Sequence, residues 1–142
     1  MLKVLYVVNR VSKTSIPLQW KESCDGNVDI IGLNKFYLFL SAIISKHDIL
    51  HGHHIKSSFV MILINCFLRK KVVFTMHGSY KYLSNLNKIF LVFIFKASDH
   101  VVFVNQCLYD ELPVRIKYML SNKYKVILNG VETKINYNLS DV

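Results

Sequence analysis

The sequence predicts an α/β domain built on a Rossmann-like, doubly wound parallel sheet of about six strands. Six short runs rich in Val, Ile and Phe lack polar alternation, which is typical of strands buried on both faces. Stretches of about 15–22 residues separate these runs and are long enough for one crossover helix each. The chain has 142 residues, of which 52% are hydrophobic, so it can bury one core. We therefore expect residues 1–142 to form a single domain.

The predicted strands follow one another along the chain, and most end in small or polar residues. They cover residues 3–8, 28–31, 48–51, 71–76, 100–104 and 125–128. Helices are predicted over residues 55–69, 84–98 and 106–121. The last helix is expected to break or kink at Pro113, because proline lacks the N–H that a helix interior needs.

The predicted helix 84–98 is apolar on all sides. The stripe assigned to the core follows i, i+3, i+4 spacing and contains Leu86, Ile89, Phe90, Phe93, Ile94 and Ala97. The opposite face is apolar as well and is flanked by lysines; it carries Leu91, Val92 and Phe95 beside Lys81, Lys88 and Lys96. Three explanations stay open: a second domain covers this face, the helix dips into a bilayer surface, or neighbouring elements bury it.

The net charge of +9 comes from 18 basic and 9 acidic residues spread over the whole chain. An anionic membrane surface, a phosphorylated ligand, nucleic acid or mere solubility could each explain this excess. No nucleic-acid-binding motif is present, so nucleic acid is not the expected partner. Three dispersed Cys without a CxxC pair argue against a disulfide framework and fit a reducing cytosol. No signal peptide or membrane-length apolar run is visible, which predicts a cytoplasmic protein that is at most peripheral at the membrane.

Polar and small residues follow five of the predicted strands. These residues are Asn9-Arg10, Gly52-His53-His54, His77-Gly78-Ser79, Asn105-Gln106 and Asn129-Gly130. Because the ligand crevice of an open parallel sheet lies beyond the carboxyl ends of its strands, these ends outline one site. Turn chemistry alone also favours Gly and Asn there, but it explains histidines at two neighbouring ends less well.

The histidines predict acid–base or ligand-orienting chemistry rather than a metal site. In an extended segment His51 and His53 share one side and His54 lies on the other, so at most two converge easily, and no metal is expected. His77 fits a general base or a ligand-orienting residue, with a packed turn histidine as the alternative. GxGxxG, GxxxxGK[ST] and GxSxG motifs are absent, which disfavours NAD, ATP and serine-hydrolase chemistry.

Five segments in chain order carry a family resemblance. They are KVLYVVN near the start, DILHGHHIKSS (48–58), KKVVFTMHGSY (70–80), ASDHVVFVNQCLYDELP (97–113) and KVILNGVET (125–133). Together they resemble the N-terminal, acceptor-binding domain of bacterial GT-B glycosyltransferases of family 4. Residues 14–20 are similar to the entry of the first helix in a subset of these enzymes.

The resemblance implies two Rossmann-like domains with the active site in the cleft between them. The N-terminal half binds the acceptor, the C-terminal half binds the nucleotide sugar, and transfer is retaining without a metal or another cofactor. The residues that the resemblance implies are His77 as the catalytic residue facing the reacting sugar, His53 and Lys56 on the acceptor side, and Asn129 and Gly130 at the hinge. Gly78, Ser79 and Tyr80 are expected at the same rim, where Gly78 permits close backbone approach or a tight turn.

Two departures from the family pattern concern the donor. The segment Asn9–Lys13 stands where the family has a Gly-Gly loop, and the glutamates Glu22, Glu111 and Glu132 form no E-x7-E pair. We therefore expect the C-terminal donor domain to be absent from this chain and the isolated chain to be inactive.

The expected function is transfer of a sugar to a glycan or lipid-linked acceptor in surface polysaccharide or glycolipid biosynthesis, at the inner face of the cytoplasmic membrane. The alternative is a non-catalytic module that docks a separate donor domain or a membrane glycolipid. A free-standing nucleotide-binding domain fits less well, because no phosphate loop is visible.

Overall fold

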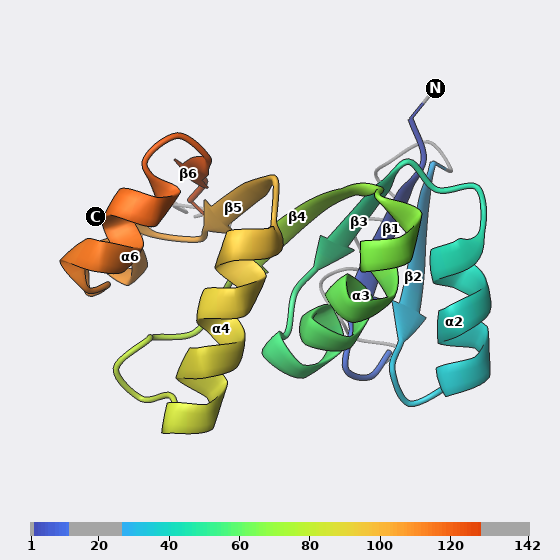
Figure 1. Cartoon of the computed structure of the whole chain (residues 1–142), viewed down its shortest axis with the longest axis horizontal. Coiled ribbons are helices and arrows are strands. Elements are labelled where there is room, and N and C mark those ends of the chain that lie inside the picture. Colours follow the sequence, from blue (N-terminus) through green and yellow to red (C-terminus); the bar gives the residue numbers. More distant parts are fainter. Residues whose placement is uncertain (1, 12–26, 129–142) are drawn as a thin grey trace, which may run out of the picture.

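The computed structural model of the chain describes residues 2–11 and 27–128. In this part of the chain six strands form one sheet in the order β2-β1-β3-β4-β5-β6, and every neighbouring pair is parallel (Figure 1). The strands are β1 (Val4–Val8), β2 (Val28–Gly32), β3 (Ile49–Gly52), β4 (Lys71–Met76), β5 (His100–Phe103) and β6 (Tyr124–Val126). The predicted Rossmann-like parallel sheet of about six strands is confirmed.

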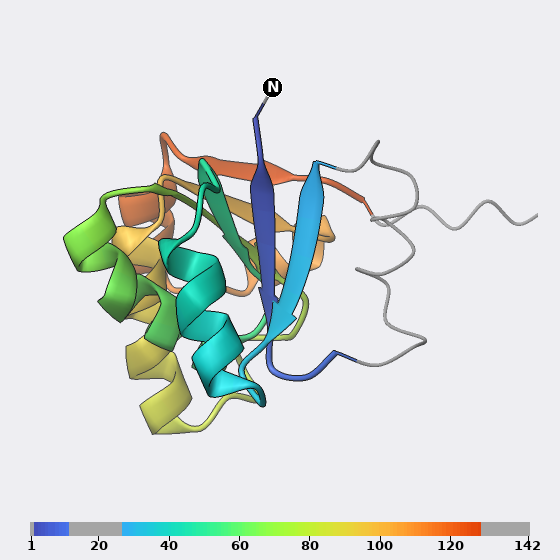
Figure 2. The ribbon, with the colours of Figure 1, turned by 90° about the vertical axis from the view of Figure 1, so that its right-hand side faces the viewer.

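Helices α2 (Phe36–Ile44), α3 (Ile55–Leu68) and α4 (Asn85–Ala97) lie side by side on one face of the sheet (Figure 2). The helix expected over 106–121 is divided into α5 (Gln106–Asp110) and α6 (Val114–Leu120). Pro113 stands directly before α6, so the predicted break lies at the proline. The segment 14–20, with its expected helix entry, lies outside the described residues.

The strand order places a topological switch point between β1 and β3. Strand β1 pairs with β2 on one side and with β3 on the other, and from β3 onward each new strand is added on the side away from β1. The connection after β1 leads to a strand on one side of the sheet, and the connection after β3 leads to a strand on the other side. Where two neighbouring strands have connections in opposite directions, a crevice opens at their carboxyl ends. A ligand site is therefore expected just beyond Val8 and Gly52.

The core lies between the sheet and the three helices. Its largest fully buried side chains include Phe39 of α2, Met61 of α3, Phe95 of α4 and, from the sheet, Leu50, Phe74 and Phe103. Phe95 makes edge-to-face contacts with Phe74 and Phe103, at ring-centroid distances of 6.0 and 6.1 Å. These contacts fix α4 over strands β4 and β5.

The predicted core face of α4 is wrong at most of its positions. Ile94 of the predicted stripe is fully buried, but Leu86 and Ile89 of that stripe are 60% and 65% exposed. Leu91 and Phe95 of the opposite face are fully buried instead. The reason is that an all-apolar helix satisfies i, i+3, i+4 spacing on more than one face, so the contacts with the sheet decide which face is buried. Among the described residues, no helix has the length and apolar character needed to cross a bilayer.

Candidate functional site

A cavity of about 320 Å³ opens at the carboxyl ends of β1, β3 and β4. Most of its polar lining comes from the residues that follow these strands, and Asn87 of α4 adds an amide. The strand-end residues are Asn9, His53, His54, Lys56, His77 and Gly78. Apolar side chains from β4, from α4 and from the loop before α4 also line it, among them Phe74, Met76, Leu83 and Leu91. An apolar pocket with a few converging polar groups at a switch point is the usual form of a small-molecule site.

The start of α3 is fastened to the end of β1. The backbone N–H of His53 donates to the carbonyl of Val7 at 3.1 Å, which continues the β1–β3 pairing past the strand end. The side-chain Oδ1 of Asn9 accepts from the Ser57 N–H at 3.2 Å. The side chain of His54, the N-cap residue of α3, makes no capping hydrogen bond. Asn9, which follows β1, caps an N–H of the first turn of α3 instead.

Three histidines form a continuous row from the sheet to the cavity. The rings of His51 and His53 stack with centroids 4.4 Å apart, as expected for residues on the same side of a strand. His53 Nδ1 and His77 Nε2 lie 3.1 Å apart, within hydrogen-bond distance. His51 Nε2 lies 2.7 Å from the Thr75 hydroxyl, and the Tyr6 ring contacts both His51 and His53. The row thus connects β1, β3 and β4.

The environment keeps these imidazoles neutral. Burial, together with the nearby His77, lowers the pKa of His51 to about 4. Burial and the neighbouring histidines lower the pKa of His53 to about 2. His77 is exposed on its outer side, yet the protein around its ring, together with His54, also lowers its pKa. At neutral pH each ring therefore has one N–H donor and one acceptor nitrogen.

The hydrogen bond between His53 and His77 couples their tautomers. If His53 donates from Nδ1, His77 accepts at Nε2 and has its proton on Nδ1; if His77 donates from Nε2, its Nδ1 is an acceptor. In either state the second nitrogen of His77 is left for a ligand. A neutral imidazole in this position can orient a sugar hydroxyl or accept its proton.

The remaining predicted site residues divide into two groups. Lys56 and Gly78 line the cavity with His53 and His77. A Cβ added to Gly78 would meet no atom within 4 Å, so there is room for a side chain at this position. The backbone of Gly78 is not in the left-handed region either, so the turn does not require a glycine. That Gly78 permits close backbone approach of a ligand stays a prediction.

Ser79 and Tyr80 are not among the residues that line the cavity, and both bond to Glu111. The Ser79 hydroxyl donates to Glu111 Oε2 at 2.7 Å, and the backbone N–H of Tyr80 donates to Oε1 of the same carboxylate. The Lys88 ammonium lies over the Tyr80 ring, 5.2 Å from its centroid. Asn129 and Gly130 lie outside the described residues.

Two structural roles at the site do not follow from the sequence: Asn9 is expected at a strand end but not as a cap of α3, and Glu111 has no predicted structural role. The position of Asn9 directly after the first strand is a signal for it, whereas Glu111 contacts a loop 31 residues earlier and has no local signal. Within the described ranges 2–11 and 27–128, no group of three or more His, Cys, Asp or Glu side chains could hold a metal ion.

Comparisons with known proteins agree with the fold. Residues 16–135 match the model of Glycosyltransferase Family 4. Among solved structures, Anabaena HepE (Alr3699) in complex with UDP is 14% identical, with a TM-score of 0.66 over 92% of this chain and 44% of the HepE chain. The complex of HepE with UDP and glucose is also 14% identical, with a TM-score of 0.63 over 92% and 45% of the two chains. The chain thus spans less than half of these structures. No curated protein matches it in sequence.

Proposed function

The chain belongs to Glycosyltransferase Family 4, and on that basis we propose that it forms the acceptor side of a sugar transferase. The reaction moves a sugar from a nucleotide-sugar donor to a hydroxyl of a glycan or lipid-linked acceptor. The bond between the anomeric carbon and the donor phosphate breaks, a bond to the acceptor oxygen forms, and the acceptor hydroxyl loses its proton. By family resemblance the anomeric configuration is retained and no metal or other cofactor takes part.

The hydrogen bond between His53 and His77 at the cavity is the observation that carries this proposal. It holds a neutral imidazole at the carboxyl edge of β4, where His77 reaches solvent and the cavity. We assign His77 to orient or stabilise the reacting sugar, and His53 to the acceptor side behind it. Lys56, the one lysine among the cavity-lining residues described, supplies a positive charge for a phosphate of the acceptor.

The donor and its binding site are proposed from the comparisons. HepE is solved with UDP and with UDP and glucose, which supports a nucleotide sugar as the donor class. In the family the donor is held by a second domain, and this chain spans 44% of the HepE chain. We propose that residues 1–142 form one domain, with Asn129 and Gly130 at the connection to a donor domain. The acceptor belongs to surface polysaccharide or glycolipid biosynthesis on the cytoplasmic side of the membrane.

Sugar transfer from a panel of nucleotide sugars to lipid-linked acceptors tests the proposal. The 142-residue chain alone is expected to transfer nothing, because it supplies one side of the cleft. The same chain joined to a donor domain of the family is expected to transfer. Turnover by the chain alone that survives repurification would contradict the assignment to the acceptor side. Acceptor binding without transfer in either form would favour the non-catalytic binding module.

A further inference from the structure

The helical layer over the sheet contains no acidic residue. Residues 49–98, which run from β3 to the end of α4, include no Asp or Glu but seven Lys and Arg. Helix α2 is likewise free of charged residues and is flanked by Lys35 and Lys46. The helices α2, α3 and α4 therefore contribute no carboxylate to their outer face. Not all seven basic residues lie on this face, since Lys71 of β4 pairs with Asp99 and Lys56 lines the cavity.

The same layer exposes an apolar stripe along α4. Leu86, Ile89 and Phe93 are spaced by three and four residues, so they lie on one side of the helix, and they are 60%, 65% and 37% exposed. Lys88 is next to Ile89 of this stripe in the sequence. Lys81 lies in the loop before α4, and Lys96 lies in the last turn of α4.

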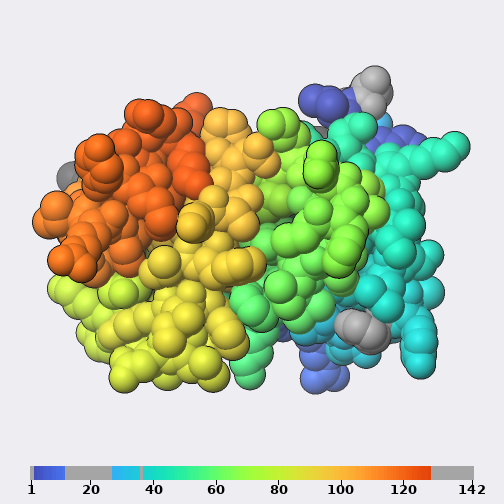
Figure 3. Space-filling model, in the orientation of Figure 1, coloured from blue at the N-terminus to red at the C-terminus, as the bar shows by residue number. Residues whose placement is uncertain are grey.

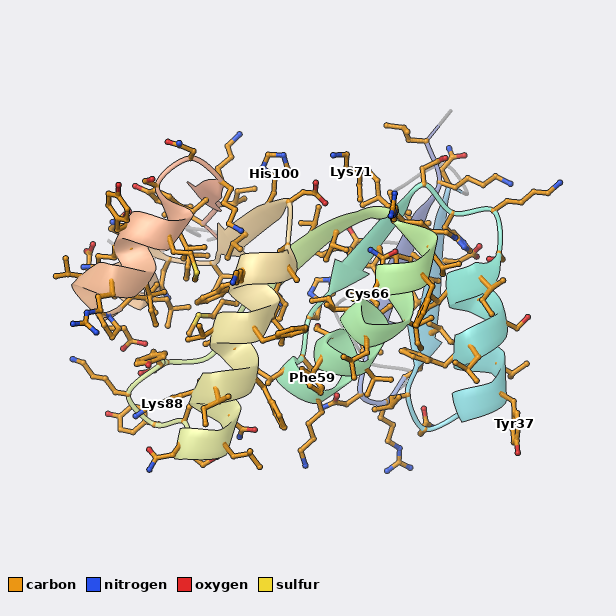
Figure 4. All side chains as sticks on the ribbon, viewed as in Figure 1. Tyr37, Phe59, Cys66, Lys71, Lys88 and His100 are labelled. Carbon is orange, nitrogen blue, oxygen red and sulfur yellow. The ribbon has the colours of Figure 1, made fainter. Side chains whose placement is uncertain are left out.

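Helix α3 extends the stripe into a surface. Leu63 and Phe67, four residues apart, are exposed, and Phe67 is 91% exposed. Phe59 of α3 stacks on Phe90 at 4.4 Å and meets Phe93 edge-on at 5.4 Å. It fills the seam between the two helices (Figure 4). Figure 3 shows α3 and α4 forming adjoining parts of one face.

From this combination we infer that the outer face of α2, α3 and α4, called here the helical face, docks on an anionic membrane surface. Exposed apolar side chains beside lysines, on helices that contain no carboxylate, suit the boundary between acyl chains and anionic headgroups. A second copy of the chain is a poor occupant, because two helical faces would place like charges against each other. The negative charge that complements this face must come from the partner, and anionic lipid supplies it.

Docking in this way brings the cavity close to the lipid. Leu83, Asn87 and Leu91 line the cavity and belong to α4 or the loop before it, so the cavity adjoins the helical face. An acceptor with a lipid anchor could then reach His77 without leaving the membrane. This consequence rests on the proposed function, whereas the docking itself does not.

Sedimentation of the 142-residue chain with lipid vesicles tests the docking. We expect binding to vesicles with about 30% phosphatidylglycerol in phosphatidylcholine, little binding to pure phosphatidylcholine, and weaker binding as salt rises. Each lysine near such a surface contributes roughly fivefold in partitioning, so the double change Lys81→Gln and Lys96→Gln should weaken binding by more than tenfold at low salt. The double change Leu86→Ser and Ile89→Ser should weaken binding at low and high salt alike.

Two double variants away from the helical face serve as controls. Lys3→Gln with Lys125→Gln removes the same charge, and Ile127→Ser with Leu128→Ser removes exposed apolar side chains; both should bind like the unchanged protein. Equal loss of binding in test and control variants would overturn the inference, as would equal binding to both lipid mixtures. A dimer in lipid-free solution that Leu86→Ser with Ile89→Ser abolishes would also overturn it. Because the vesicles contain no sugar acceptor, their result is independent of the transfer assay.

Discussion

The carboxylate of Glu111 accepts a hydrogen bond from the Ser79 hydroxyl at 2.7 Å, and its other oxygen accepts the backbone N–H of Tyr80. Glu111 follows α5, whereas Ser79 and Tyr80 belong to the loop between β4 and α4. One side chain therefore ties together two successive crossover connections. Because this loop begins with His77, the same contact anchors the residues that directly follow the site.

Replacing Glu111 should loosen this loop. Glu111→Ala leaves the Ser79 hydroxyl and the Tyr80 N–H without their charged acceptor, and hydrogen bonds to charged groups contribute about 1.5–3 kcal/mol each. Because Ser79, Tyr80 and Glu111 are only half-buried, water can replace part of this bonding, and we expect a free energy of unfolding lower by roughly 1–3 kcal/mol in total. Hydrogen exchange at the Tyr80 amide should become faster. Asp110→Ala is the matched control, since Asp110 bonds Gln106 and does not contact the loop. Unchanged exchange at Tyr80 in the Glu111 variant would show that other contacts hold the loop.

The two glycines at the site should respond oppositely to a methyl group. A Cβ on Gly52 would lie 2.1 Å from Ser58 Oγ and 2.8 Å from Ser58 Cβ, and Ser58 is fully buried. Gly52→Ala should therefore lower the free energy of unfolding by about 1–3 kcal/mol through overpacking. Gly78→Ala meets open space and should leave the melting temperature unchanged while it weakens binding of the sugar acceptor. A Gly78 variant with full acceptor affinity would mean that no ligand approaches this backbone.

The strands and the strand-end site were predictable because local signals determine them. Val- and Ile-rich runs mark β1, β4 and β5, and parallel neighbours necessarily bring His53 and His77 to the same edge. The orientation of α4 was not predictable, since its apolar residues fit two faces equally and only the packing of Phe95 on Phe74 and Phe103 distinguishes them.

Contacts between distant segments account for the rest of what the sequence missed. Ser79 and Tyr80 carry polar groups at a strand end and were expected at the cavity, but the carboxylate of Glu111 engages both. No pattern within either segment indicates this pairing, because it depends on where α5 ends relative to the β4–α4 loop. The role of Asn9 as a cap of α3 likewise depends on the packing of β1 beside β3.

The buried histidines should make the fold sensitive to acid. His51 and His53 stay neutral in the folded chain, with pKa values of about 4 and about 2, but take up protons near pH 6.5 once unfolded. Protons therefore bind preferentially to the unfolded state, so stability is complete above pH 6.5 and falls as the pH drops below it. Each ring should reduce the free energy of unfolding by on the order of 2 kcal/mol at pH 5.

Urea unfolding at pH 7, 6 and 5 measures this dependence. His51→Gln keeps a group that can bond the Thr75 hydroxyl but does not titrate in this range, so its stability should fall less between pH 6 and pH 5. His100→Gln, at an exposed position at the start of β5, should retain the slope of the unchanged protein. Identical slopes for the His51 variant and the unchanged chain would show that His51 is already protonated in the folded state.

His77→Ala separates a site residue from a packing residue. His77 is exposed, and its ring is held by the hydrogen bond to His53. Loss of the His77 side chain should therefore change the free energy of unfolding by less than about 1 kcal/mol. If the ring positions the reacting sugar, transfer should fall by roughly 10²–10⁴-fold in the chain joined to a donor domain. His100→Ala, an exposed histidine at the opposite edge of the sheet, should leave both quantities unchanged (Figure 4). A His77 variant that melts early yet keeps normal turnover per folded molecule would assign His77 to the scaffold, and the cavity would then need another residue to orient the sugar.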